Sequence, residues 1–226
     1  MLFVFIDKVC YKLYMNFHIV SLFPGAFDSY LNESILKRAI EDKKIKVKFY
    51  NPRDHGEGRV DDKPYGGGPG MVIQALPVIK AIAKAKGKNK KVKIIWFTPK
   101  GKQFDTAYAK NTAKKYTDII FVCGRYEGID ARVKKVFKVD EISVGPFVLT
   151  GGEIPAMLLI DSIARQVKGV LGDFASLEET RIAAKDAFTR PEIIEYKKKK
   201  YRVPPVLLSG HQAKIDEWRK QNAENN

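Results

Sequence analysis

Two glycine-rich segments each follow a short apolar run of the kind that forms a buried strand. The first reads Cys-Gly-Arg-Tyr-Glu-Gly-Ile-Asp over residues 123–130, and the second reads Ser-Val-Gly-Pro-Phe-Val-Leu-Thr-Gly-Gly-Glu-Ile-Pro-Ala over residues 143–156. In open α/β sheets, ligands bind in the crevice outside the carboxyl ends of the strands. Glycine at these ends permits unusual backbone angles and lets a ligand approach the main chain closely. The two segments therefore predict a binding site built largely from backbone N–H and C=O groups.

The sequence lacks the motifs of several common binding sites. No Gly-x-x-x-x-Gly-Lys motif occurs, and no Gly-x-Gly-x-x-Gly motif follows the first predicted strand. This argues against a P-loop NTPase and against a standard dinucleotide site. The three histidines, His18, His55 and His211, lie far apart and have no cysteine at ligand spacing. A zinc site is therefore not expected, and no metal-ligating residues are predicted.

The charge of the chain indicates a polyanionic partner. The 226 residues carry a formal net charge of +15 and have a pI of about 9.6. Nucleic acid is the usual partner of so basic a chain, and a lysine-rich proteome is the alternative. The stretch Lys80–Lys102 holds nine lysines and no acidic residue, a density that suits phosphate contacts. A second basic run, Lys197–Lys200, lies between Tyr196 and Tyr201, whose rings suit an unstacked RNA base.

Cysteine usage and hydropathy bear on the compartment. Only Cys10 and Cys123 are present, which is no disulfide framework and fits a reducing cytoplasm. No apolar run approaches the ~20 residues of a membrane-spanning helix, so no membrane association is expected. The apolar segment 1–14 carries Asp7, Lys8 and Lys12 and is a poor signal peptide. We interpret it as an N-terminal extension or the result of a misassigned start codon.

Four motifs occurring in one order carry a family resemblance. They are Tyr-Gly-Gly-Gly-Pro-Gly-Met at 65–71, Cys-Gly-Arg-Tyr-Glu-Gly-Ile-Asp at 123–130, Leu-Thr-Gly-Gly-Glu-Ile-Pro-Ala at 149–156 and Val-Pro-Pro-Val-Leu-Leu-Ser-Gly at 203–210. This set resembles the bacterial tRNA (guanine-N1)-methyltransferase family, over nearly the whole chain from about Met15 to Trp218. The resemblance implies transfer of a methyl group from S-adenosylmethionine to N1 of the guanosine at tRNA position 37, just 3′ of the anticodon.

The resemblance also implies which residues bind the methyl donor. They come from three loops, the same two glycine-rich segments and a third loop that follows an earlier strand. The residues expected to form this pocket are Thr98, Pro99, Gly124, Tyr126, Glu127, Gly128, Ser143, Val144, Gly145, Phe147, Leu149, Gly151, Gly152 and Pro155. Adenine needs apolar walls and backbone hydrogen bonds, which Val144, Leu149 and the glycines supply. The other interpretation of these glycines is that they are only turn residues.

Methylation of guanine N1 requires a general base and a cation near O6. By resemblance, Arg165 occupies the family position of the cation. The family places a catalytic Asp after a Gly-Val-Leu-Gly segment, found here at 169–172, but direct counting puts Thr180 at the Asp position. A threonine hydroxyl is a poor base at neutral pH, so Glu179 is the nearest substitute, with Glu178 and Asp186 behind it. The family also uses Mg²⁺, without a fixed protein cage.

Apolar periodicity predicts the elements that hold these residues. Strands are expected over 17–22, 45–50, 92–97, 118–123 and 141–144, with the third ended by Thr98-Pro99-Lys100-Gly101. Helices are expected over 28–43, 73–86, 105–115, 153–167 and about 212–221, and 51–71 is expected to be a long loop. Alternating strands and helices predict an α/β fold with a mainly parallel sheet. Periodicity alone predicts an unknotted chain, whereas the resemblance implies a trefoil knot of the SPOUT type between Val92 and Val167.

The predicted domain organisation has four parts. After the extension over 1–14, residues 15–168 form the knotted domain that binds the methyl donor, and 169–189 form a flexible linker. Residues 190–226 form a small, short helical C-terminal domain that binds the tRNA anticodon stem-loop. By resemblance, the enzyme is a homodimer whose active site forms where two subunits meet.

Three other functions remain open at this point. The same fold would serve to methylate another RNA base or a ribose 2′-hydroxyl. A relative that has lost catalysis would bind cofactor and RNA without turnover. A basic ribosome-associated module would account for the charge, but it would not need the glycine-rich pocket.

Overall fold

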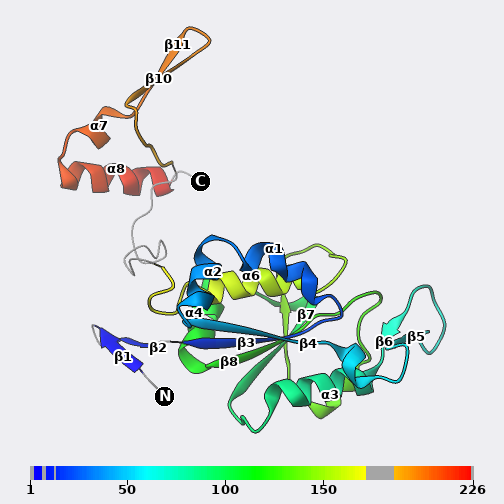
Figure 1. Ribbon diagram of the computed structural model, residues 1–226. Helices are drawn as coiled ribbons and strands as arrows, with labels where there is room; N and C mark the ends of the chain where they lie inside the picture. Colours follow the sequence, from blue (N-terminus) through cyan, green and yellow to red (C-terminus); the bar gives the residue numbers. More distant parts are fainter. Residues whose placement is uncertain (1–2, 7–8, 13, 172–185, 225–226) are drawn as a thin grey trace. The chain divides into compact units, whose positions relative to one another are not determined.

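The computed structural model describes residues 3–6, 9–12, 14–171 and 186–224, and it divides into two compact units, Met1–Gly172 and Asp173–Asn226. The first unit is built around a five-stranded sheet with the strand order β4-β3-β8-β7-β9 (Figure 1). These strands are β3 (Met15–Val20), β4 (Ile45–Tyr50), β7 (Val92–Gln103), β8 (Asp118–Val122) and β9 (Asp140–Ser143). All four neighbouring pairs are parallel, which confirms the predicted α/β class with a parallel sheet.

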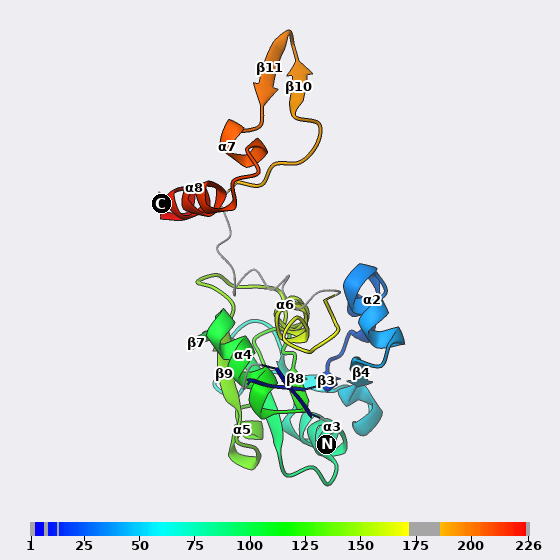
Figure 2. The same ribbon diagram turned by 90° about the vertical axis from the view of Figure 1, so that its left-hand side faces the viewer.

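Helices cover both faces of this sheet, as Figure 1 and the turned view in Figure 2 show for α2 and α6 on one side and α3 on the other. Alternate residues of each strand point to opposite faces. Phe17 and Phe121 join the core under the helices α1 (Asp28–Leu31), α2 (Ser34–Glu41), α4 (Thr106–Lys115) and α6 (Glu153–Ala164). Their neighbours Val20 and Val122 join the core under α3 (Ala75–Lys86) and α5 (Val133–Val136). Burial on both faces explains why the strands are apolar runs.

The structure corrects the predicted helix over 28–43, which is two helices. Asn32 ends α1, Glu33 is extended, and Ser34 begins α2 with a φ of +47°. Leu31 and Leu36 nevertheless enter the same core. The apolar periodicity therefore ran through the break, because both helices bury their apolar residues on one face of the sheet.

The predicted strand over 92–97 also needs correction, because β7 continues to Gln103. Phe97 and Lys102 both lie opposite Ile142 of β9, so residues 98–101 form a bulge within the strand. Gly101 makes the close approach possible, since a Cβ there would lie 2.6 Å from the carbonyl carbon of Glu141. Pairing resumes after the bulge, and only the tertiary partner β9 shows this.

The segment 51–71 contains two short elements between its loops, η2 (Pro52–His55) and β5 (Asp61–Asp62). Residues Val72–Ile73 form β6, which pairs with β5, so the helix predicted from 73 begins at Ala75. A 3₁₀ helix η1 (Pro24–Phe27) precedes α1. A hairpin of β1 (Phe3–Ile6) and β2 (Val9–Lys12) lies within the predicted extension.

The second unit contains a hairpin and two helices. The hairpin pairs β10 (Ile193–Tyr196) with β11 (Lys199–Arg202), and the helices are α7 (Pro205–Leu208) and α8 (Gln212–Glu224). The helix α8 was predicted, and the hairpin and α7 were not. The rings of Phe188 and Trp218 meet edge to face, with their centroids 6.2 Å apart.

Candidate functional site

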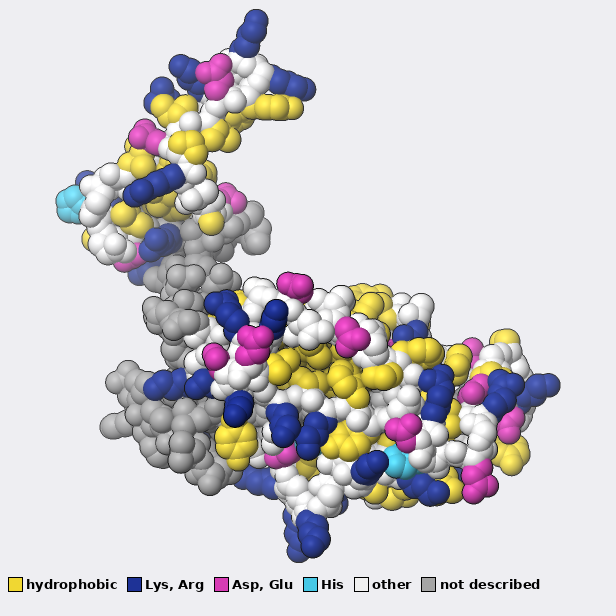
Figure 3. Space-filling model, in the orientation of Figure 1, with side chains coloured by type: hydrophobic (Ala, Val, Ile, Leu, Met, Phe, Trp, Pro, Cys, Tyr) yellow, Lys and Arg dark blue, Asp and Glu magenta, His cyan; other side chains and the backbone are white. Residues whose placement is uncertain are grey.

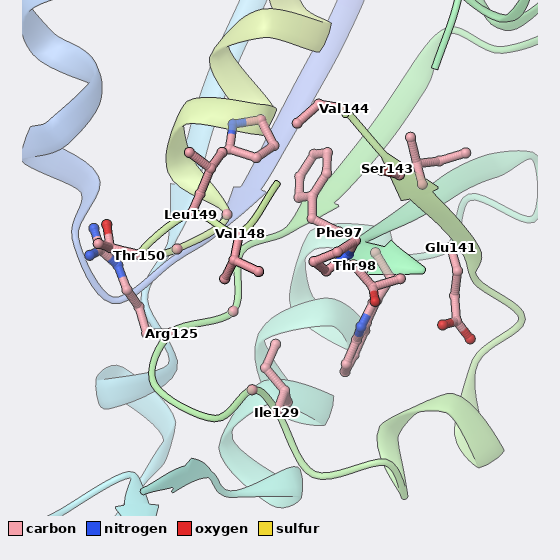
Figure 4. Close-up of a pocket in the computed structure, with 18 of the residues that line it drawn as sticks. Phe97, Thr98, Arg125, Ile129, Glu141, Ser143, Val144, Val148, Leu149 and Thr150 are labelled. Carbon is pink, nitrogen blue, oxygen red and sulfur yellow. The ribbon is translucent and has the colours of Figure 1, made fainter. Parts of the chain in front are cut away.

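A cavity of about 430 Å³ opens beside the bulge of β7 and at the carboxyl ends of β8 and β9 (Figure 4). Its walls are the bulge 98–101 within β7 and the loops 124–131 and 144–152, which follow β8 and β9. All fourteen residues predicted as donor-binding line this one cavity. Residues about 57 positions apart in sequence are thus brought together by the parallel strand order.

The cavity has further lining residues that sequence reasoning missed. They are Trp96, Phe97, Arg125, Ile129, Ala131, Lys134, Glu141, Ile142, Val148 and Thr150. Four of them belong to the two glycine-rich segments and follow directly from extending the predicted site along those segments. Of the others, Trp96, Phe97, Glu141 and Ile142 lie within β7 and β9, and Ala131 lies in the loop after β8. Lys134 belongs to α5, a four-residue helix too short to leave a periodic signal.

Gly152 is held against the end of β8 by its backbone. Its N–H donates to the carbonyl of Gly124 at 2.9 Å, and a bridge pairs Arg125 with Gly151. A Cβ on Gly152 would lie 2.6 Å from the Cα of Cys123, closer than such atoms approach in proteins. The second loop therefore requires glycine here because its backbone touches the first loop directly.

The loop after β9 folds back on itself at its start. The Ser143 hydroxyl accepts a hydrogen bond from the N–H of Gly145 at 3.2 Å and donates to the carbonyl of Gly145 at 3.0 Å. A side chain at Gly145 would overlap the Phe147 ring. Phe147 and Val148 remain 52% and 84% exposed, so this wall of the cavity is apolar and open to a ligand.

The loop after β8 is joined to the glycine-rich segment 65–71. The N–H of Glu127 donates to the carbonyl of Met71, and the carbonyl of Gly128 accepts from the N–H of Ile73, both at 3.0 Å. Gly70 packs so closely that a Cβ there would lie 2.6 Å from the carboxylate of Glu127. Tyr126 has a φ of +58°, uncommon for a residue with a side chain and of the kind found at functional sites.

A buried charge network lies behind the cavity. Glu153, at the first turn of α6, is 3% exposed and accepts a hydrogen bond from the Ser21 hydroxyl at 2.7 Å. Its other carboxylate oxygen lies 3.0 Å from Nε of Arg125, and the Arg125 guanidinium stacks over the ring of Phe23 at 4.7 Å. A helix N-terminus also favours a carboxylate. The network thus links the ends of β3 and β8 to the start of α6.

Cys123 lies beside this network and is fully buried. Burial, and then the Glu153 carboxylate, raise the pKa of its thiol well above its usual value, and Arg125 opposes them. A thiol that stays protonated is a poor nucleophile. Cys123 therefore packs against the site and performs no chemistry in it.

Of the predicted catalytic residues, the structure describes only Arg165, and it does not line the cavity. Arg165 caps the C-terminal end of α6 and is half-buried, whereas Pro155 lines the cavity from the N-terminal end. Ten residues of helix separate them, about 15 Å at 1.5 Å per residue. Glu179 and Thr180, with Glu178, lie outside the described residues, while Asp186 is exposed in the second unit.

Within residues 3–6, 9–12, 14–171 and 186–224, no three His, Cys, Asp or Glu side chains cluster in a way that could hold a metal ion. In the same part of the chain, no helix is both long and apolar enough to cross a membrane.

The fold and the cavity define a class of protein. It is a parallel α/β protein with a candidate ligand site at the carboxyl edge of its sheet, built from the bulge of β7 and two loops whose backbones hydrogen-bond at Gly124 and Gly152. The particular family follows from comparison with known proteins. The chain matches the family described as tRNA (Guanine-1)-methyltransferase TrmD over residues 15–226, and it belongs to that family.

Individual relatives agree with this assignment. The chain is 45% identical over 219 residues to a tRNA (guanine-N(1)-)-methyltransferase of Clostridioides difficile, with 92% of each chain covered. It is 44% identical over 208 residues to the protein of that name from Campylobacter jejuni subsp. doylei, covering 89% and 88% of the two chains. The crystal structure of tRNA (m1G37) methyltransferase from Aquifex aeolicus matches with a TM-score of 0.74 at 36% identity, covering 93% of this chain and 89% of the other.

Proposed function

We propose that this protein transfers the methyl group of S-adenosylmethionine to N1 of the guanosine at tRNA position 37. The observation that carries the proposal is the convergence of all fourteen expected donor-binding residues on one cavity, in a chain that belongs to the family. The family name gives the reaction, and the cavity gives the residues that would position the donor.

The cavity suits the methyl donor in shape and chemistry. Val144, Val148 and Leu149 form an apolar wall for the adenine (Figure 4), and the glycine backbones beside it offer N–H and C=O groups. Glu127 and Glu141 line the cavity and suit the positive charges and hydroxyls of such a ligand. When bound there, S-adenosylmethionine supplies an electrophilic methyl group. The residues around it orient the ligand and exclude water.

The proton on guanine N1 and the charge that develops at O6 need groups from elsewhere. We assign the O6 contact to Arg165 and the proton transfer to a linker acid, Glu179 in the first instance, with Thr180 at the position that counting gives to the family Asp. A positioned base typically contributes a factor of about 10²–10⁴ to the rate. Since Arg165 lies at the far end of α6 from the cavity, a second subunit would have to supply it.

An exposed apolar surface supports a homodimer. The helix α6 is apolar almost all round: seven of its residues are buried, yet Ile154 and Leu158 are 57% and 43% exposed. Tyr30 and Ile35 of α1 and α2 are also exposed at 45% and 37%, and Figure 3 shows hydrophobic side chains gathered over this region. A helix that is apolar on all sides is normally covered, and a second copy of the chain is the proposed cover.

The proposal includes a trefoil knot in the first unit. After β9 the chain returns past β7 to the end of β8, where Gly152 meets Gly124, and α6 then packs with α4 and β3. A return of this kind across the bulge 98–101 supports a threaded path. The structure does not hold a cage of carboxylates for Mg²⁺ within the described residues, so no step is assigned to that ion.

Contacts to tRNA are proposed for the second unit. Lys197 and Lys198 form the two-residue turn of the hairpin, with φ of +48° and +62°, and the ammonium group of Lys197 lies 5.4 Å from the centre of the Tyr196 ring. Tyr196 and Tyr201 are 63% and 49% exposed. A basic turn flanked by exposed aromatic rings suits phosphates and an unstacked anticodon-loop base.

The test is transfer of a radiolabelled methyl group to unmodified tRNA transcripts with guanosine or adenosine at position 37. Wild type should methylate only the guanosine transcript. Arg165→Gln should lower kcat about 100-fold or more, and Glu179→Gln should lower it by a similar factor. Thr180→Ala should lower kcat much less. Lys168→Gln, three residues after Arg165, removes one positive charge from the same part of the chain and is the matched control. Nucleoside mass spectrometry of the product distinguishes N1 methylation from another base or a ribose. Cofactor and tRNA binding without transfer would overturn the enzymatic proposal.

A further inference from the structure

A second cavity, of about 410 Å³, lies at the opposite edge of the same sheet. It is formed where β7 and β9 begin, together with the end of α3 and the segment after α5. The lining residues are Lys86, Lys90, Val92, Lys93, Ile94, Tyr116, Val136, Phe137, Lys138 and Asp140. The two cavities share no lining residue, although their linings adjoin along the strands: Ile94 lies two residues before Trp96 on β7, and Asp140 directly precedes Glu141 on β9. Lys86, Lys90 and Lys138 all precede the first residues of these strands, so the charged part of the second cavity lies away from the loops of the first.

The charges around this second cavity are not balanced. Four lysines and one aspartate line it. Lys93 and Asp140 form an ion pair and neutralise one another. Within the described part of the chain, Lys86, Lys90 and Lys138 have no carboxylate within the 4.0 Å of an ion pair. Three positive charges without a carboxylate partner therefore lie around one hollow, which favours an anion there. Lys90 and Lys138 are exposed, so salt and water screen part of this attraction.

The floor of the cavity is fixed by packing. The Lys93 side chain is 17% exposed, and its ammonium group lies 5.4 Å from the centre of the Tyr116 ring and 5.9 Å from that of Tyr108. Asp140 also accepts a hydrogen bond from the Tyr108 hydroxyl at 3.3 Å. These contacts hold Asp140 on Lys93 and keep its charge from the other lysines.

The three unpaired lysines come from separate elements. Lys86 ends α3, where a cation also stabilises the helix terminus. Lys90 belongs to the loop between α3 and β7, which projects at the lower edge of Figure 3 with basic side chains at its tip, and Lys138 follows α5. Helix stabilisation accounts for Lys86 alone, so it does not explain the convergence.

We infer that this cavity is a second binding site, for a ligand that presents two or more adjacent phosphate groups. Lysine ammonium groups bind phosphate as flexible point charges. Arginine, whose planar fork suits carboxylate and phosphate alike, is absent from the lining, so the cavity favours a ligand of high charge density over one of fixed planar geometry. Adjacent phosphates occur in an RNA backbone and in free nucleoside polyphosphates. The RNA source rests on the proposed function, and the site itself does not.

The binding test uses inorganic tripolyphosphate as the probe, with isothermal titration calorimetry at low salt. The triple variant Lys86→Gln/Lys90→Gln/Lys138→Gln removes the unpaired charges, and Lys46→Gln/Lys48→Gln/Lys114→Gln removes the same charge from exposed positions elsewhere in the unit. We expect the first variant to weaken binding about tenfold or more and the control by less than about twofold. Equal weakening in both variants, or no binding by wild type, would overturn the site.

The source of the phosphates is decided by methyl-transfer kinetics on the same proteins. A raised KM for full-length tRNA in the first variant, with kcat and the donor KM unchanged, identifies the RNA backbone as the ligand. An unchanged tRNA KM together with lost tripolyphosphate binding identifies a free polyphosphate. Absence of transfer by wild type would refute the proposed function, while tripolyphosphate binding would still test the site.

Discussion

The two edges of one sheet are built in opposite ways. At the carboxyl edge, the main chain of two glycine-rich loops forms part of the cavity wall beside apolar side chains, and Gly152 and Gly124 hydrogen-bond directly across the two loops. At the amino edge, the cavity wall is side chain, and lysines from three elements surround the Lys93–Asp140 pair. A backbone site can fix a ligand's orientation closely because it has few degrees of freedom. A site formed by lysine side chains attracts a negatively charged ligand without fixing the ligand's orientation, because each ammonium group is a point charge on a flexible stem.

The largest expected effect concerns the access of a reagent to the Cys123 thiol, which lies behind the loops of the carboxyl edge. Cys123 is buried behind the loop crossing, and burial raises the pKa of its thiol. In a Cys10→Ser variant, alkylation of Cys123 by iodoacetamide should be about 1,000-fold slower than in the urea-unfolded chain. Protection should persist from pH 7 to 9, because the folded thiol stays protonated where the unfolded thiol ionises. Rapid alkylation of the folded protein would show that this edge opens readily.

Folding stability should follow the same titration. The pKa of the Cys123 thiol is higher in the folded than in the unfolded chain. The thiol therefore makes its full contribution to the free energy of unfolding below the pKa of the unfolded thiol, about 8.5, and this contribution is lost as the pH rises above that value. Urea unfolding of the Cys10→Ser variant at pH 7 and pH 9.5, compared with a Cys10→Ser/Cys123→Ala variant, isolates this loss. An equal pH dependence in both proteins would contradict it.

Substitution of the crossing glycine should be the next largest effect. Gly152→Ala places a Cβ 2.6 Å from a backbone atom, whereas Gly124→Ala meets only the Ile129 side chain at 3.6 Å. The first should weaken donor binding about tenfold, or about 1.4 kcal/mol, because the backbone of Gly152 must move away from Cys123 and Gly124. It should also lower the free energy of unfolding by about 1–3 kcal/mol. Calorimetry with S-adenosylhomocysteine measures the former. Gly124→Ala is the matched control for stability, and Gly25→Ala, whose Cβ lies outside the cavity and 3.7 Å from Oδ2 of Asp28, is the control for donor binding.

Loss of the buried ion pair should have a somewhat smaller effect. Arg125→Met leaves the carboxylate of Glu153 buried with Ser21 as its remaining hydrogen-bond partner. Since Arg125 is partly exposed, we expect a loss of about 2 kcal/mol in the free energy of unfolding rather than the full penalty of a buried charge. The double variant Arg125→Met/Glu153→Gln should recover part of this loss. Additive effects of the two single changes would exclude coupling.

The matching pair at the amino edge should matter least. Asp140→Asn removes the partner of Lys93, whose side chain is 17% exposed, while Asp140 is 35% exposed. Water screens this pair, so the free energy of unfolding should fall by about 1 kcal/mol or less. The same change adds an unpaired cation to the lysine cavity, and tripolyphosphate should bind more tightly. Weaker binding would mean that Asp140 positions the lysines instead of opposing the ligand.

The sequence by itself determined the fold class and most of the first site. The burial of a strand or helix leaves a periodic pattern of apolar residues in the local sequence, so the pattern predicts where such an element lies. The observed bounds of β4, β8, β9 and α4 agree with this prediction within about two residues. The first cavity was predictable because two of its walls are continuous loops, so each glycine-rich segment carries several lining residues at once. The split of residues 28–43 was not predictable, because α1 and α2 bury their apolar residues in the same core and the periodicity runs through the break. The continuation of β7 was not predictable, because its pairing with β9 decides it.

Only the tertiary structure decided which distant residues meet. Ser21 and Glu153 are separated by 132 positions, and their contact depends on β3 lying next to β8. The same holds for Lys86 and Lys138, which sequence places in unrelated basic stretches and the sheet order brings to one cavity. Placement of Arg165 away from the donor cavity follows from the length and direction of α6. Strand order is a global property of packing, and no local pattern of residues encodes it.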